Sequence, residues 1–320
     1  MVADPAAMML RAPVVCVVGP TASGKTDLAQ AIALALGGEV VSADSMQVYR
    51  GMDIGTGKIP FSDRLVPHHG LDLVDPGQPF SAALFQRYAR KCFQNIDARG
   101  RRVVLAGGTG FYVRAAIDGY EFPAGEQVGN AVRERCARIV EREGSAALWR
   151  MLSDRDPASA ALIPAGDVKR VARALELLEA GGSYAEQRAR LATIPQVVPA
   201  LFVGLAVDPS LLKDRIDARV DAMMAAGLVD EVAGLLARGF REGVTAPQAI
   251  GYKEIASALD GKVSFSQAVE QIKTATRRYA KRQRTWFRKD ARIRWINAND
   301  GDSDALLERA LEALRGDAVR

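Results

Sequence analysis

The stretch Gly19-Pro20-Thr21-Ala22-Ser23-Gly24-Lys25-Thr26 fits the pattern G-x-x-x-x-G-K-[ST] of a phosphate-binding loop, or P-loop. It follows the apolar, β-branched run 14–18, which is typical of a buried parallel strand. It precedes residues 27–36, whose alanines, leucines and isoleucine predict a helix. A strand, a glycine-rich loop and a helix in this order hold a phosphate chain on backbone N–H groups, at the positive end of the helix dipole. In such a loop Lys25 adds a full positive charge, and the Thr26 hydroxyl can bind Mg²⁺.

Other segments of the chain alternate in the same way. Apolar runs at residues 40–43, 102–106 and 200–207 predict three further strands. Residues 81–97 predict a helix with Ser81 as its N-cap. Alternating strands and helices indicate an α/β domain with a parallel sheet.

The middle of the chain has a different pattern. Residues from about 119 to 199 are charged and helical in periodicity, with Gly181-Gly182 and a proline-containing segment as punctuation. We therefore predict an α/β fold with a P-loop NTPase-like parallel sheet, formed by residues 1–118 and 198–320 and interrupted by a helical insertion domain at residues 119–197. The other predicted helices are 128–142, 146–152, 167–180, 184–191, 211–226, 230–238, 252–259 and 266–288.

Composition places the chain among globular proteins. Its 320 residues suit about two domains, and no apolar run is long enough to span a membrane. Residues 1–13 lack the basic and apolar regions of a signal peptide. Cys16, Cys92 and Cys136 stand singly, which indicates neither a zinc site nor a disulfide framework. We expect a cytoplasmic monomer with no membrane partner.

Positive charge is concentrated near the C-terminus. The net charge is only +5, but residues 273–288 contain no acid and interleave basic residues with Tyr279, Trp286 and Phe287. This pattern favours a polyanionic partner, although a basic surface helix whose aromatic residues pack on the core would look the same. On a helix Arg277, Lys281 and Arg284 would form one stripe and Arg278 and Arg282 the next, with the three aromatic residues anchoring the helix to the core.

Polar and glycine-rich segments follow predicted strands, where α/β sheets place their ligands. Asp44 comes directly after the strand at 40–43, and a carboxylate there can hold Mg²⁺, accept a proton from a nucleophile, or simply form a turn. The glycines of residues 50–58 allow a loop to approach a ligand closely. Thr109 lies in a second glycine turn and can hydrogen-bond a substrate. The adjacent pair His68 and His69 favours a structural role, because neighbouring residues of a strand cannot both face one metal.

Seven segments together carry a family resemblance: GPTASGKT (19–26), SADSMQVYRGMDIGTGK (42–58), HHGLDLVDP (68–76), GGTGFYVRA (107–115), RIDARVDAMMAAGLVDEV (215–232), QAIGYKE (248–254) and TRRYAKRQRTWFR (276–288). With these segments the chain resembles the bacterial tRNA dimethylallyltransferases, also called tRNA isopentenyltransferases, from about Val14 to Trp295. The resemblance implies transfer of a dimethylallyl group from dimethylallyl diphosphate to N6 of adenosine 37, next to the anticodon of tRNA. Its implied cofactor is Mg²⁺, and its implied partners are dimethylallyl diphosphate and the tRNA anticodon stem-loop.

The resemblance also implies roles for single residues. Asp44 matches the general base, Thr109 a contact near the reacting centre, Arg219 a member of the diphosphate clamp, and Thr26 the Mg²⁺ ligand. The diphosphate would lie on Gly19, Pro20, Thr21, Ala22, Ser23, Gly24, Lys25 and Thr26. The residues matching tRNA contacts are Asp44, Ser45, Met46, Gln47, Arg133, Lys169, Arg170, Val171, Ala172, Arg173, Gln248, Ala249, Ile250, Gly251, Tyr252, Lys253, Thr276, Arg277, Arg278, Tyr279, Ala280, Lys281, Arg282 and Gln283.

One segment departs from the family pattern. Where the family has a form like R-I-H-P-N-D-x-Q-R, residues 161–170 lack the His and Asn, and Lys169 replaces Gln. This departure concerns RNA recognition by the insertion and leaves the residues of the chemistry intact. Two related enzymes would share the P-loop core: a P-loop kinase of a small metabolite or nucleotide, and an adenylate isopentenyltransferase. Neither of them needs the basic segment 273–288, and a non-catalytic RNA-binding protein would not need Asp44 beside an intact P-loop.

Overall fold

The computed structural model describes residues 8–122 and 131–315, and the chain divides into two compact units. The first unit combines residues 1–118 with 196–320, and the second is formed by residues 119–195. The first three residues of the helix predicted at 128–142 lie outside the described residues.

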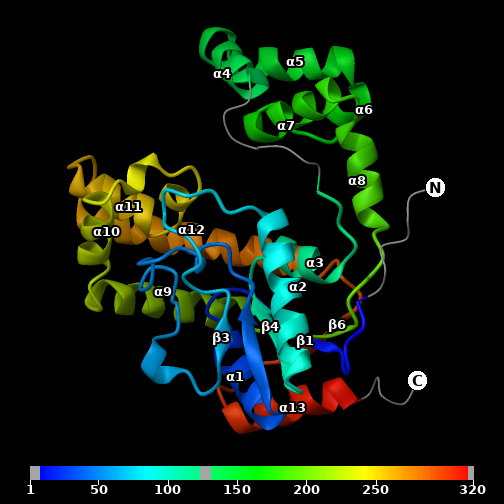
Figure 1. The fold of residues 1–320 in the computed structure, drawn as a ribbon. Helices are drawn as coiled ribbons and strands as arrows, with labels where there is room; N and C mark the ends of the chain where they lie inside the picture. The colour runs from blue at the N-terminus through cyan, green and yellow to red at the C-terminus, as the bar shows by residue number, and fades with distance from the viewer. Residues whose placement is uncertain (1–7, 123–130, 316–320) are drawn as a thin grey trace. The chain divides into compact units, whose positions relative to one another are not determined.

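The first unit is built on a six-stranded sheet in the order β3-β2-β4-β1-β5-β6, in which every neighbouring pair is parallel (Figure 1). The strands are β1 (Val14–Val18), β2 (Gly38–Ser42), β3 (His68–His69), β4 (Arg102–Gly107), β5 (Ala200–Ala206) and β6 (Ile293–Asn297). The predicted parallel α/β fold is confirmed. Because the strands are parallel, the loops after β1, β2 and β4 leave the sheet at the same edge.

Helices cover both faces of the sheet. Val14, Cys16 and Val18 of β1 pack in one cluster with α2 (Ala82–Ala98) and α3 (Gly110–Ile117). Val15 and Val17 point the other way and pack with α1 (Lys25–Ala35) and α13 (Ser303–Arg315). Since successive side chains of a strand face opposite sides, the fully apolar β1 is buried on both faces, as expected of a central parallel strand.

A helical layer beside the sheet carries its own apolar core. It comprises α9 (Pro209–Ala225), α10 (Leu228–Leu236), α11 (Tyr252–Leu259) and α12 (Phe265–Phe287), with short 3₁₀ helices at Phe240–Glu242 and Ala246–Gln248. A further 3₁₀ helix, Phe61–Asp63, lies in the loop between β2 and β3. Tyr49 and Met52 from the loop after β2 are buried against Leu228, Tyr252 and Ile272 of these helices. This packing joins the loop after β2 to helices that follow it by about two hundred residues in the chain.

The second unit contains α4 (Ala131–Glu143), α5 (Ser145–Arg155), α6 (Pro157–Ala160), α7 (Val168–Glu179) and α8 (Tyr184–Ala192). Its core consists of Leu148, Leu152, Val171 and Leu175, with Cys136. The periodicity thus predicted the helices here to within a few residues, apart from the four-residue α6.

The sequence patterns did not predict two of the strands, β3 and β6. Residues after Asp208 were expected to be helical, whereas Ile293–Asn297 forms β6 beside β5. Only Ile293 and Ile296 of β6 are buried, because it is an edge strand, and its charged and exposed residues hide the apolar run that marks a central strand. β3 is only two residues long. Among the described residues no helix is both long and apolar enough to cross a membrane.

Candidate active site

The P-loop leaves β1 at Val18 and enters α1 at Lys25. Ala22 (φ 60°) and Gly24 (φ 86°) both adopt the left-handed conformation, which turns successive backbone N–H groups toward the inside of the loop. Gly24 is the N-cap of α1 and supplies no side-chain hydrogen bond. The first-turn amides of α1 are therefore left to an anionic ligand at the positive end of the helix dipole.

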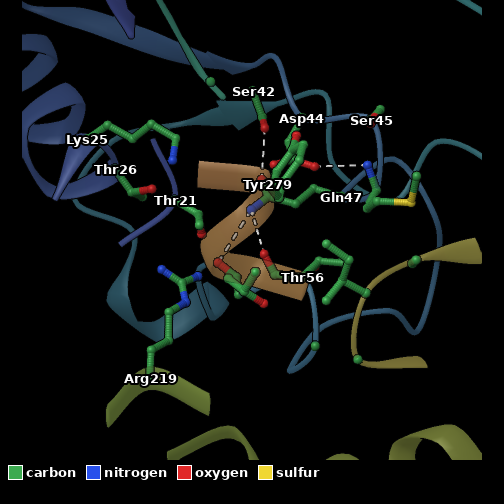
Figure 2. A pocket seen from close by; sticks show the side chains of 18 of the residues that line it. Thr21, Lys25, Thr26, Ser42, Asp44, Ser45, Gln47, Thr56, Arg219 and Tyr279 are labelled. Carbon is green, nitrogen blue, oxygen red and sulfur yellow. Dashed lines mark hydrogen bonds between the residues drawn. The ribbon is translucent and has the colours of Figure 1, made fainter. Parts of the chain in front are cut away.

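The P-loop borders a cavity of ≈ 320 Å³ at the carboxyl edge of the sheet. Lys25 and Arg219 both line it, and Figure 2 shows them on the same side as Thr26. Burial and the nearby charge of Arg219 lower the pKa of Lys25 to about 8, and the Asp44 carboxylate opposes this shift. Burial likewise lowers the pKa of Arg219. Two cations that destabilise each other at one cavity make a site that favours an anion carrying more than one negative charge.

The glycine-rich loop after β2 shapes the place of Arg219. A Cβ atom at Gly57, which has φ +59°, would overlap the Arg219 guanidinium. Arg219 comes from α9, so this contact joins two segments that are distant in the chain. Glycine at position 57 is thus required both by the backbone conformation and by the closely packed arginine.

Three amides of that loop are satisfied inside the protein. Glu231 of α10 accepts hydrogen bonds from the backbone N–H groups of Asp53 at 3.0 Å, Ile54 at 2.8 Å and Gly55 at 3.2 Å. The Tyr252 hydroxyl donates to the same carboxylate at 2.6 Å. This part of the loop therefore holds an internal carboxylate, while Gly55 and Gly57 line the cavity.

Asp44 follows β2 and faces the cavity across from the P-loop (Figure 2). Its Oδ1 accepts the Met46 amide at 2.9 Å, so the carboxylate does form the turn that its position suggested. The Thr109 hydroxyl accepts the Ser45 amide at 3.1 Å, which ties this turn to the glycine turn after β4. Burial and the charge of Asp44 raise the pKa of Tyr279 to about 12. Asp44 thus lies near both the cavity and α12, with its carboxylate held by a backbone amide.

Helix α12 contributes a wall of the cavity, through Thr276, Tyr279, Arg282 and Gln283. The Tyr279 hydroxyl hydrogen-bonds with the side chains of Thr109 and Gln283. Gln283 is buried, and its Oε1 accepts the Thr21 amide of the P-loop at 2.9 Å while its Nε2 donates to the Gly108 carbonyl at 2.9 Å. The basic helix and the P-loop therefore share one hydrogen-bond network. The sequence offered no sign of this bridge beyond the position of Gln283 in the basic segment.

Burial divides the predicted tRNA contact set, which stays a prediction. Some of its members have buried side chains that do not line the cavity: Val171, Ala172, Tyr252 and Ala280. Two others, Ala249 and Gln283, are buried but line the cavity. Gln248, Lys253, Arg278, Lys281 and Arg282 are exposed. The exposed residues are therefore the ones whose side chains are open to an RNA at the surface. Each helix carries buried positions on the face toward the core and exposed positions on the opposite face.

The predicted stripe of Arg277, Lys281 and Arg284 also needs correction. Arg277 donates to both carboxylate oxygens of Asp217, at 2.8 and 2.6 Å. Its charge is consequently neutralised within the protein, and only Lys281 and Arg284 of that stripe keep an uncompensated charge among the described residues. Trp286, expected to anchor the helix to the core, is instead 44% exposed, whereas Phe287 is buried.

In the second unit two of the predicted arginines meet one carboxylate. Arg133 donates through Nε and Nη2 to both oxygens of Glu176, and Arg173 donates through Nη1 at 3.2 Å. Glu176 is buried, whereas Lys169 and Arg170 are exposed. In the segment that departs from the family pattern, Asp167 caps α7 by accepting the Arg170 amide at 3.1 Å.

The two histidines make separate bonds. His68 bonds through Nδ1 to the Val66 carbonyl at 2.8 Å, and His69 bonds through Nε2 to Glu39 at 2.7 Å. His68 also lines the cavity. Burial lowers the pKa of His68. Across residues 8–122 and 131–315, no group of three or more His, Cys, Asp or Glu side chains is arranged to hold a metal.

Family models and two curated relatives match this chain. The family model described as IPP transferase matches residues 47–290, and the one described as isopentenyl transferase matches residues 12–68. The chain is 44% identical to tRNA dimethylallyltransferase 2 of Syntrophus aciditrophicus, over 95% of this chain and 97% of the relative. It is 45% identical to the tRNA dimethylallyltransferase of a Nocardioides species, over 95% and 96% of the two chains.

Solved structures are similar over nearly the same length. The crystal structure of the tRNA isopentenylpyrophosphate transferase of Bacillus halodurans matches with a TM-score of 0.70 and 41% identity, over 96% of each chain. A eukaryotic dimethylallyltransferase, solved in crystallographic snapshots of its action on tRNA, matches with a TM-score of 0.75 and 28% identity. That match covers 90% of this chain and 74% of the eukaryotic one.

Proposed function

The chain belongs to the IPP transferase family, and from that premise we propose that it is a tRNA dimethylallyltransferase. The reaction transfers the dimethylallyl group of dimethylallyl diphosphate to N6 of adenosine 37 in tRNA, giving N6-isopentenyladenosine. The observation that carries the proposal is the shared cavity, in which a cradle for a polyanion and the Asp44 carboxylate face one another. Since its substrate is tRNA, we expect the enzyme in the cytoplasm.

The cradle acts on the leaving group. As the bond between the allylic carbon and the diphosphate oxygen breaks, negative charge grows on the diphosphate. Lys25 and Arg219 line the cavity beside the amino end of α1, so their charges lie where they can stabilise the developing charge. A site of this kind serves a diphosphate leaving group as well as it serves a nucleotide.

Asp44 acts on the nucleophile. The adenine amine forms the new carbon–nitrogen bond, and the proton that it loses passes to the Asp44 carboxylate. An adenine amine is a weak nucleophile, so holding it in line with the allylic carbon contributes more than basicity does. The Met46 amide and the neighbouring Ser45–Thr109 hydrogen bond keep the turn that carries this carboxylate in place.

The residues present fit a Mg²⁺ ion. The Thr26 hydroxyl and the Asp44 carboxylate both face the cavity, and Mg²⁺ is commonly bound by one or two protein oxygens together with substrate phosphates and water. Thr26 would hold the ion against the diphosphate. When bound, the ion supplies further neutralisation of the leaving group.

The cavity also implies how RNA reaches it. An adenine stacked in an anticodon loop cannot enter a cavity of this size with its neighbours, so the base has to leave the stack. The exposed cations of α12 flank the cavity and attract the phosphate backbone. Arg133 and Arg173, oriented by Glu176, are proposed as further RNA contacts.

The decisive experiment incubates the purified protein with dimethylallyl diphosphate, Mg²⁺ and unmodified tRNA, and then digests the tRNA to nucleosides. We expect isopentenyladenosine to form without ATP. Parallel reactions with AMP in place of tRNA, and with ATP in place of the prenyl diphosphate, separate this activity from an adenylate isopentenyltransferase and from a kinase. Product only with AMP, or phosphoryl transfer from ATP, would refute the proposal.

A further inference from the structure

Helix α12 carries an aromatic side chain, Trp286, just beyond the cavity. From the sequence this residue was expected to pack in the core. Trp286 follows Arg282 and Gln283, which line the cavity, by about one helical turn. We propose that the exposed face of Trp286 stacks on an unstacked base that flanks the reacting adenosine. The inference rests on the proposed function, because it requires that the substrate is an RNA.

Local packing sets the position of the Trp286 ring. A Cβ atom at Gly110 would overlap the pyrrole edge of the indole, so the ring lies directly on the backbone of the glycine turn after β4. Gly110 directly follows Thr109, whose hydroxyl accepts the Ser45 amide beside Asp44. The indole, 44% exposed, is therefore held by rigid elements adjacent to the proposed reacting centre. A rigid, half-exposed aromatic ring is the platform on which proteins stack single-stranded bases.

Spacing along α12 fits a base next to the reacting adenosine as the partner of Trp286. An α-helix rises ~1.5 Å per residue, so Trp286 lies about 6 Å along the axis from Arg282 at the cavity. Successive stacked nucleotides are only ~3.4 Å apart. Two neighbouring bases, one in the cavity and one at Trp286, therefore have to be spread apart. Extruding the adenosine spreads the backbone in this way. The neighbouring base then loses a stacking partner, and the indole replaces it.

Charge around Trp286 supports an RNA as the occupant. Lys281, Arg282 and Arg284 on α12, and Arg288 and Lys289 directly after it, lie within five residues of Trp286 in the chain. None of them forms an ion pair with another described residue. Arg282 lies over the Tyr279 ring, with its Cζ 5.7 Å from the ring centroid. Uncompensated cations interleaved with an exposed aromatic ring are the pattern of single-strand recognition, whereas a protein-binding apolar patch would exclude such a density of charge.

The chain offers a matched control in Trp295. It is 38% exposed, belongs to the edge strand β6 and packs against Gly204 of β5. It does not line the cavity and does not belong to the acid-free segment. Both tryptophans therefore have an exposed indole. Only Trp286 also lies beside the cavity and among basic residues, and these two features predict stacking.

The first test measures the affinity of full-length variants for an anticodon stem-loop RNA. Trp286→Ala is expected to weaken binding by about tenfold or more, Trp286→Phe by much less, and Trp295→Ala not at all. Affinity for dimethylallyl diphosphate should be unchanged in all three. Equal affinities of wild type and Trp286→Ala for the RNA would overturn the inference. Absence of prenyl transfer to tRNA by the wild type would instead refute the proposed function.

A second test identifies the partner base and does not depend on the stability of the Ala variant. Stem-loops with an abasic nucleotide on either side of the reacting adenosine are compared with the intact RNA. If the base stacks on Trp286, the loss caused by Trp286→Phe or Trp286→Ala should vanish with one of the two abasic RNAs. In the Trp149→Phe/Trp295→Phe protein, whose only indole is Trp286, intact RNA should change the fluorescence and that abasic RNA should not. A loss that stays the same with both abasic RNAs contradicts stacking.

Discussion

The Oε1 atom of Gln283 accepts the backbone N–H of Thr21 at 2.9 Å, which joins the basic helix α12 to the P-loop. The same buried amide donates to the Gly108 carbonyl at 2.9 Å. One side chain therefore sets the spacing of three segments that meet at the cavity. Because the P-loop and α12 are proposed to bind different substrates, this bridge couples the place of the diphosphate to that of the RNA.

Loss of this bridge should affect the diphosphate before the RNA. In a Gln283→Leu variant the Thr21 amide and the Gly108 carbonyl lose their partner, which costs about 1–3 kcal/mol for a buried polar group. We expect a higher KM for dimethylallyl diphosphate and a lower kcat, with tRNA affinity nearly unchanged. Thermal unfolding of the variant separates a local effect from general destabilisation. A selective loss of tRNA affinity would mean that Gln283 reads the RNA directly.

Replacing Asp44 should slow the chemical step. Asp44→Asn keeps the size of the side chain and can still accept the Met46 amide, but an amide does not take up the proton of the adenine amine. Single-turnover prenyl transfer is expected to fall by about a hundredfold or more, with little change in tRNA affinity. A single-turnover rate equal to that of the wild type would mean that Asp44 only stabilises the turn after β2 and is not the general base.

The charge of Lys25 should impose a limit at high pH. Burial and Arg219 lower the pKa of Lys25 to about 8, so the ammonium is present below this pH and is lost as the pH rises through it. The kcat/KM for dimethylallyl diphosphate, which reports the free enzyme, is therefore expected to decline above about pH 8. Lys25→Met should lower kcat/KM and remove this decline. A decline of the same size in Lys25→Met would assign the titration to another group.

Salt dependence tests two unpaired cations of α12, the exposed Lys281 and the half-buried Arg284. Each phosphate contact contributes a log–log slope of about −0.7 for single-stranded RNA, so Lys281→Gln/Arg284→Gln should flatten the slope of tRNA affinity by about one unit or more. Arg277 is left in place because Asp217 already neutralises it. The matched control is Arg11→Gln/Arg101→Gln, two exposed arginines near the amino ends of β1 and β4, at the opposite edge of the sheet. Equal slopes in both double variants would show that the α12 cations are only solvated.

Local pattern predicted those elements whose stability depends on their own residues. β1 was predicted at its observed bounds, and α2 begins after Ser81, which accepts the Leu84 amide as expected of an N-cap. Both signals are local, because the apolar run and the capping oxygen act within a few residues. β6 was missed because its stability comes from pairing with β5, more than eighty residues earlier in the chain.

The local sequence pattern does not predict which of Trp286 and Phe287 is buried. Adjacent residues on a helix point about 100° apart, so they cannot both face the core, but nothing in TRRYAKRQRTWFR says which of them does. Packing of α12 against the rest of the unit buries Phe287 and leaves Trp286 on the glycine turn. Likewise Arg277 carries the same charge as Lys281 in the sequence, and only the proximity of Asp217 on α9 distinguishes them.

The sequence by itself determined the P-loop, the parallel α/β core and, through its ordered motifs, the family to which the chain belongs. Only the tertiary structure decided that Lys25, Asp44 and Arg219 face one cavity, and that Gln283 ties that cavity to α12. The physical reason is the range of the interactions. A loop conformation and a helix period are set by neighbouring residues, whereas a cavity is formed by side chains from distant segments, whose directions depend on how the whole unit packs.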